Sequence, residues 1–137
     1  MAFEDGYEPD ITIYDILPED YKKFVESCLK QHHIIELFDD LVFRIRENIN
    51  KLLELHGHSK IKLKKEFEIV LDTAYEKKII SERDYKKLTK FRKVRNKLTH
   101  QRMISVFYWL IIEDVLEINF VTIKSKIDQK EYDKIEP

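Results

Sequence analysis

The chain has 137 residues, 37% of them charged and 43% hydrophobic, which fits one domain with a hydrophobic core of its own. Two glycines and three prolines exclude collagen-like and low-complexity chains, and a single cysteine excludes a disulfide framework and favours a reducing, intracellular setting. The formal net charge of −1 hides a strong asymmetry: residues 1–56 carry 13 acids and 6 bases, residues 57–102 carry 6 and 15, and residues 103–137 carry 7 and 4. The basic middle segment, at +9, is therefore flanked by acidic segments at −7 and −3.

Residues 1–17 are rich in acids, and we expect a short irregular arm that is poorly ordered or extended. The arm has neither the basic nor the apolar region of a secretory signal, so a cytoplasmic location is expected. Pro18 suits the first turn of a helix and predicts one over about 18–30. The apolar side chains that could pin the arm are Ile11, Ile13 and Ile16.

Residues 34–55 carry the sharpest helical pattern in the chain. Gly57 follows this segment and is a natural C-terminal cap. The apolar stripe steps by three and four residues, which is typical of a helix packed in a bundle. Its members are Ile35, Phe38, Val42, Ile45, Ile49 and Leu52.

Two further helices are predicted in the basic middle segment. The first covers about 60–77, with lysines crowded at its start, where the helix dipole disfavours cations. An anionic partner or a solvated basic face would each explain those lysines. The second begins at Ser81, which is placed as an N-terminal cap, and runs towards Leu98.

A last helix is predicted from Ile104 to about Lys124, apolar over most of its circumference. Its uncharged stretch, 103–112, has about half of the roughly 20 residues that a membrane span needs, so no membrane association is expected. The predicted fold is all-α, an antiparallel bundle of four to five helices. We expect an arm over 1–17, the bundle over 18–128 and a C-terminal tail over 129–137.

Arg95 stands out within the fourth predicted helix. On an ideal helical wheel it falls inside the apolar arc, where a guanidinium needs an acid or another anion as partner. Asn96 and His100, four residues apart, face another side, so Arg95 and His100 lie about 140° apart on an undistorted helix. Either the helix bends after Leu98, or a second copy of the chain completes the site.

The run Arg95-Asn96-Lys97-Leu98-Thr99-His100 resembles the R-x(4–6)-H signature of the HEPN superfamily. HEPN domains are all-α, and many are metal-independent ribonucleases of toxin–antitoxin, abortive-infection and CRISPR systems. The resemblance extends over about 79–115. The stretch from Ile79 to Asn96 resembles the run before the motif in HEPN-related proteins, and the mannitol operon repressor family, whose function is regulatory, shows a similar run.

The resemblance implies a homodimeric, cofactor-free endoribonuclease that acts as a toxin or anti-phage effector. His100 would assist attack of an RNA 2′-hydroxyl on the adjacent phosphate, Arg95 would stabilise the phosphate charge, and Asn96 would orient His100 or the phosphate. A further partner would be an antitoxin or regulatory protein. Many toxins of this type carry a modifiable tyrosine two residues after the motif histidine, where this chain has Arg102. The residues expected to hold RNA phosphates are Arg92, Lys93, Lys97 and Arg102.

Other interpretations remain open. Arg95 could simply pair with a buried acid near a capping histidine, or the fold could be a non-catalytic regulatory or scaffolding module like the mannitol operon repressor. Cysteine and histidine side chains lack the spacing of a known zinc site, so no metal site is expected. The residues concerned are Cys28, His32, His33, His56 and His58.

Overall fold

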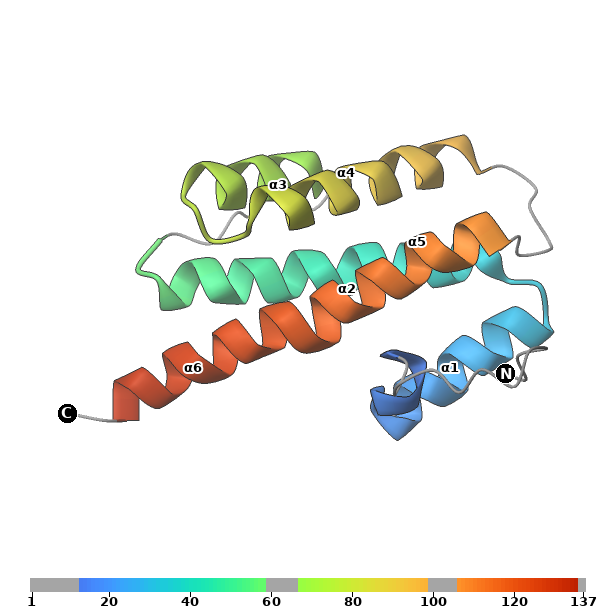
Figure 1. Ribbon diagram of the computed structural model, residues 1–137, viewed down its shortest axis with the longest axis horizontal. Helices are drawn as coiled ribbons and strands as arrows, with labels where there is room; N and C mark the ends of the chain where they lie inside the picture. Colours follow the sequence, from blue (N-terminus) through green and yellow to red (C-terminus); the bar gives the residue numbers. More distant parts are fainter. Residues whose placement is uncertain (1–12, 59–66, 99–105, 136–137) are drawn as a thin grey trace, which may run out of the picture.

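The computed structural model describes residues 13–58, 67–98 and 106–135, and every regular element among them is helical. The predicted all-α bundle is confirmed. The elements are a 3₁₀ turn η1 (Ile13–Ile16), α1 (Glu19–Lys30), α2 (Ile34–Leu55), α3 (Phe67–Glu76), α4 (Glu82–Lys97), α5 (Val106–Glu117), a π-helical stretch η2 (Ile118–Ile123) and α6 (Lys124–Ile135). Because α5, η2 and α6 follow one another without a break, they form one long helix (Figure 1).

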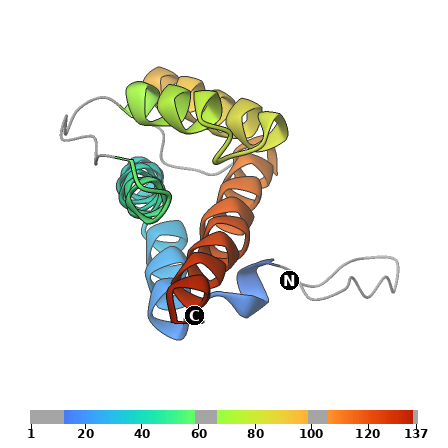
Figure 2. The ribbon, with the colours of Figure 1, turned by 90° about the vertical axis from the view of Figure 1, so that its left-hand side faces the viewer.

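Helix α2 is the central helix of the bundle. It contacts α1, the α3–α4 hairpin and the long α5–α6 helix, and Figure 2 shows it end-on with the hairpin above it, α1 below it and the long helix on one side. Its predicted bounds are confirmed, but the buried face is wider than the predicted stripe. Ile35 and Val42 are half-buried, whereas Ile34, Leu37 and Leu41 are fully buried. A straight helix drifts against a seven-residue repeat, and neighbours on several sides bury more than one stripe.

The start and end signals of two helices are confirmed. Gly57 has a φ of +84°, the left-handed conformation that a C-terminal cap requires, and it ends α2. Ser81 precedes α4, and its Oγ accepts a hydrogen bond from the Asp84 backbone N–H at 3.1 Å. The start predicted for the third helix, with its lysines, lies outside the described residues.

Replacing Ser81 with alanine is expected to reduce the free energy of unfolding by about 1 kcal/mol, because one N–H at the start of α4 loses its acceptor. Urea denaturation followed by circular dichroism measures this loss. Ser125 is a matched control, since it is an exposed serine within α6 and caps no helix. Equal stability of Ser81→Ala and the wild type would contradict the capping role.

The two ends of the described chain differ from the expectation. The predicted last helix ends at about Lys124, whereas α6 continues to Ile135, and the Lys51 ammonium contacts the Glu131 carboxylate at 2.9 Å. Ile127 is the one buried residue of α6, so this helix has only a weak apolar periodicity in the sequence. At the other end, residues 13–16 form a 3₁₀ turn rather than an extended segment.

The turn η1 is held by different side chains from those predicted. Ile16 is exposed and Ile13 is half-buried, while Ile11 lies outside the described residues. Leu17 is buried instead, and the Tyr14 ring meets the edge of Trp109 on α5. This contact fixes η1 beside α5.

Candidate functional site

The residues of the Arg95–His100 motif begin in the last turn of α4. Arg92, Lys93, Arg95, Asn96 and Lys97 all lie on α4, whereas His100 and Arg102 lie outside the described residues. Helix α4 ends at Lys97, and Leu98 takes an extended backbone with a ψ of 124°. The predicted separation of 140° between Arg95 and His100 therefore does not apply, because it assumed one undistorted helix through both residues.

Arg95 pairs with Asp39 of α2 in a two-pronged contact. Its Nε donates to one Asp39 carboxylate oxygen at 2.5 Å and its Nη2 donates to the other at 3.2 Å. The Arg95 side chain is 28% exposed, and that of Asp39 is 55% exposed. The prediction that Arg95 needs an anionic partner is confirmed, but the partner is an exposed acid rather than a buried one. The hydrogen bond to Asp39 raises the pKa of Arg95, so the guanidinium stays charged.

A shallow cleft of about 650 Å³ surrounds this pair. Arg92, on the same side of α4, contacts the Glu68 carboxylate of α3 at 3.6 Å. The cleft therefore contains two arginines, each with a carboxylate partner from a neighbouring helix. Its lining residues are Asp39, Val42, Phe67, Glu68, Arg92, Arg95 and Asn96.

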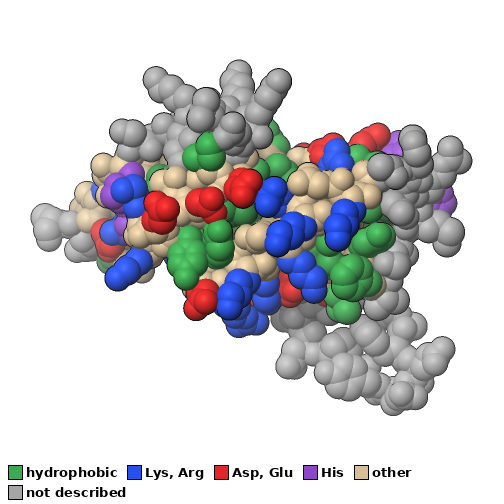
Figure 3. Space-filling model, turned by 90° about the horizontal axis from the view of Figure 1, so that it is seen from above, with side chains coloured by type: hydrophobic (Ala, Val, Ile, Leu, Met, Phe, Trp, Pro, Cys, Tyr) green, Lys and Arg blue, Asp and Glu red, His purple; other side chains and the backbone are tan. Residues whose placement is uncertain are grey.

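The structure separates the residues predicted to hold RNA into two groups. Arg92 lines the cleft, whereas Lys93 and Lys97 are exposed on the outer side of α4. Lys93 lines a second, smaller depression with Tyr85 and two further lysines. Seen from the α3–α4 side, several Lys and Arg side chains gather next to hydrophobic ones on this outer surface (Figure 3).

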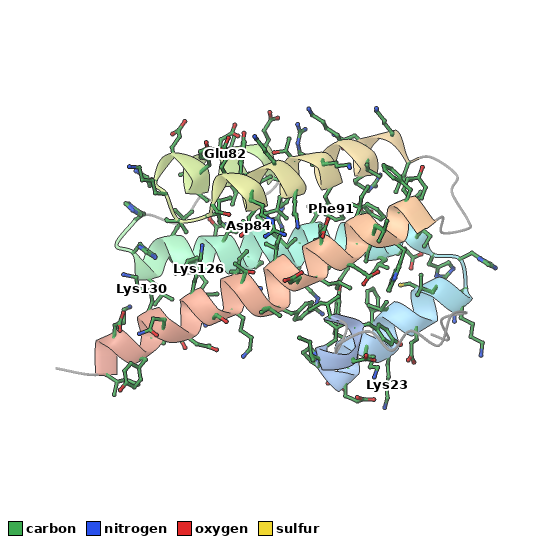
Figure 4. All side chains as sticks on the ribbon, in the orientation of Figure 1. Lys23, Glu82, Asp84, Phe91, Lys126 and Lys130 are labelled. Carbon is green, nitrogen blue, oxygen red and sulfur yellow. The ribbon has the colours of Figure 1, made fainter. Side chains whose placement is uncertain are left out.

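The acids of the cleft, Asp39 and Glu68, were missed in the sequence. A stacked ring pair sets the position of Asp39: Phe38 and Phe91 are fully buried with ring centroids 4.8 Å apart, and Phe91 points from α4 towards α2 (Figure 4). Asp39 follows Phe38 directly, and Arg95 lies one turn after Phe91, so the ring contact brings the ion pair together. The sequence contains both phenylalanines, but it does not show that their rings are in contact.

The cysteine and histidine side chains considered as metal ligands do not gather. Within the described ranges, no group of three or more His, Cys, Asp or Glu side chains is placed to hold a metal ion. Cys28 is buried, and burial raises the pKa of its thiol. His33 lies 3.3 Å from the Glu36 carboxylate.

No protein-family model, curated protein or solved structure matches this chain. Among the helices of the described residues, none is long and apolar enough to cross a membrane.

Proposed function

We propose that this protein is a metal-independent endoribonuclease of HEPN type, a cytoplasmic toxin or anti-phage effector that works as a homodimer. The observation that carries the proposal is the position of Arg95 and Asn96, adjacent in the motif, in one open cleft at the end of α4. Only Thr99 separates Leu98, where α4 has ended, from His100 in the sequence. The three motif residues are therefore close together in the sequence, at the point where α4 ends.

Arg95 can bind a phosphate without leaving Asp39. A guanidinium has five N–H donors, and Asp39 accepts from two of its nitrogens, so donors remain for a phosphate oxygen. Asp39 holds the planar group in one orientation, which suits stabilisation of a phosphate that gains charge during reaction. Asn96 is exposed at the cleft and can donate its amide N–H to the same phosphate or to His100.

The reaction needs no metal in this scheme. His100 removes the proton of an RNA 2′-hydroxyl, and the 2′-oxygen forms a bond with the adjacent phosphorus. The bond from phosphorus to the 5′-oxygen breaks, that oxygen takes up a proton from water, and His100 returns the proton that it removed to the solvent. The products are a 2′,3′-cyclic phosphate and a 5′-hydroxyl, with the charge of the intermediate phosphate held by Arg95.

The proposal is tested by incubating the purified protein with total RNA in EDTA and identifying the new ends. Cleavage with 2′,3′-cyclic phosphate and 5′-hydroxyl ends is expected. Intact RNA, or products with 5′-phosphate ends, would contradict the proposal.

One observation favours a second candidate function, a non-catalytic regulatory or scaffolding module like the mannitol operon repressor. Both cleft arginines are already paired with carboxylates, which reduces the attraction of the cleft for a polyanion. This candidate predicts intact RNA in the same assay and a stable protein partner, such as an antitoxin or regulatory protein, that co-purifies with the chain.

A further inference from the structure

The outer face of α4 carries a row of cations, here called the α4 cation row. Its members recur at intervals of three and four residues, which places them along one side of the helix over about 21 Å. All are exposed, and the Lys86 ammonium contacts Glu82 at 3.1 Å, the one ion pair that the row makes within the described chain. Like charges at this spacing repel, so the row destabilises α4 unless something compensates it. The row consists of Arg83, Lys86, Lys90, Lys93 and Lys97.

Helix α5 carries a row of two apolar and two acidic side chains beside the α4 cation row. This row, here called the α5 row, consists of Phe107, Leu110, Glu113 and Glu117. The two apolar side chains are 52% and 57% exposed. Neither Glu113 nor Glu117 pairs with a cation anywhere in the described ranges, and burial together with the charge of Asp114 raises the pKa of Glu113. The last three members of the row line an open groove of about 560 Å³ between α5 and η1.

Two contacts fix how the two rows lie against each other. The Lys87 ammonium contacts the Asp114 carboxylate at 3.2 Å, and the Lys90 ammonium lies 5.3 Å from the Phe107 ring centre. Lys90 comes after Lys87 in the sequence, whereas its partner Phe107 comes before Asp114, so α4 and α5 run antiparallel. The first part of the cation row therefore lies level with the acidic part of α5, and Lys90 lies level with the apolar part.

We propose that a second copy of this chain docks on this face, around a two-fold axis that runs between α4 and α5 along their length. Rotation by 180° about that axis places the α4 cation row of each copy against the α5 row of the other. The rotation does not change the position of a residue along the axis, so residues that are level within one copy are also level across the interface. Acidic side chains then meet cations, and lysine stems cover Phe107 and Leu110. The contact occurs twice, as a self-complementary dimer requires, and the four helices form an antiparallel bundle.

The arrangement also has a consequence for the cleft. A two-fold axis parallel to α4 leaves both copies of α4 running in the same direction, so Arg95 and Asn96 of both copies lie at the same end of the dimer. The inference deepens the homodimer of the proposed function by naming its docking face, and it rests on that function for the consequence at the cleft. The docking face itself is argued from charge and apolar exposure, and it can be tested without RNA.

Charge reversal on each row provides the test, with the full chain and sedimentation velocity as the measurement. The wild type is expected to be a dimer. Arg83→Glu/Lys86→Glu and Glu113→Lys/Glu117→Lys should each be monomeric, with dissociation constants raised by about a hundredfold or more, because like charges then face each other twice. Mixing the two variants should restore a dimer, since one chain then carries two acidic rows and the other two basic rows.

Matched controls keep the test decisive. Lys23→Glu/Lys134→Glu makes the same charge change on exposed positions of α1 and α6 and should leave the dimer intact. If Glu113→Lys/Glu117→Lys lacks a helical circular dichroism spectrum, Leu110→Lys/Glu117→Lys takes its place, because both of those side chains are exposed.

A monomeric wild type would overturn the proposal, and so would row variants that dimerise as well as the wild type or a mixture that stays monomeric. None of these outcomes depends on cleavage. A dimer without ribonuclease activity would contradict the proposed function alone.

Discussion

Replacing Arg95 with alanine is expected to slow RNA cleavage by about 10²–10³-fold while the helices stay folded. Arg95 is the guanidinium that the cleft presents in a fixed orientation, and loss of one such donor to a developing oxyanion has an effect of about this size. Initial cleavage rates in EDTA measure it, with circular dichroism as the check on folding.

Arg44→Ala is the matched control for this substitution. Arg44 also pairs with an aspartate of α2, through a contact of 2.8 Å to Asp40, but it does not line the cleft. Its removal should leave the cleavage rate within a factor of a few of the wild type. Equal loss in both variants would assign the effect to stability or general charge, and unchanged cleavage by Arg95→Ala would remove Arg95 from the site.

Replacing Phe91 with alanine is expected to lower the free energy of unfolding by about 3–5 kcal/mol. Phe91 is fully buried and stacks on Phe38, and this contact joins α4 to the central helix. The cavity left behind would be enclosed by the core, where truncation of a large ring is most destabilising. Urea denaturation gives the value.

Phe43→Ala provides the comparison, because Phe43 is 53% exposed on α2. Phe43→Ala should change the free energy of unfolding by no more than about 0.5 kcal/mol, as most surface substitutions do. A loss below about 1 kcal/mol for Phe91→Ala would contradict the account in which the Phe38–Phe91 contact brings Asp39 and Arg95 together.

The parts of the fold that the sequence predicts are those with strong local signals. The bounds of α2 follow from its apolar periodicity and from Gly57, and the start of α4 follows from Ser81, whose side chain caps the helix in the structure. Helix α6 was missed beyond Lys124 because its one buried residue, Ile127, produces no periodic stripe. Its position depends on contacts with α2, which a local pattern does not contain.

The site was predictable to a smaller extent. The wheel placed Arg95 on the core side of α4 and required an anionic partner, and the structure has that ion pair. The identity of the partner, Asp39, depends on which rings meet between α2 and α4, and this is tertiary information. The different directions of Arg92 and Lys93 follow from the helical period once the core side of α4 is known.

We propose that the motif at the end of α4 cleaves RNA without a metal ion. The most direct test compares the wild type and His100→Ala side by side on the same RNA in EDTA, with circular dichroism to confirm that both are folded. We expect cleavage by the wild type and a rate lower by about 10²-fold or more for His100→Ala, since the proton-transfer group is gone. Cleavage by His100→Ala at the wild-type rate would contradict it.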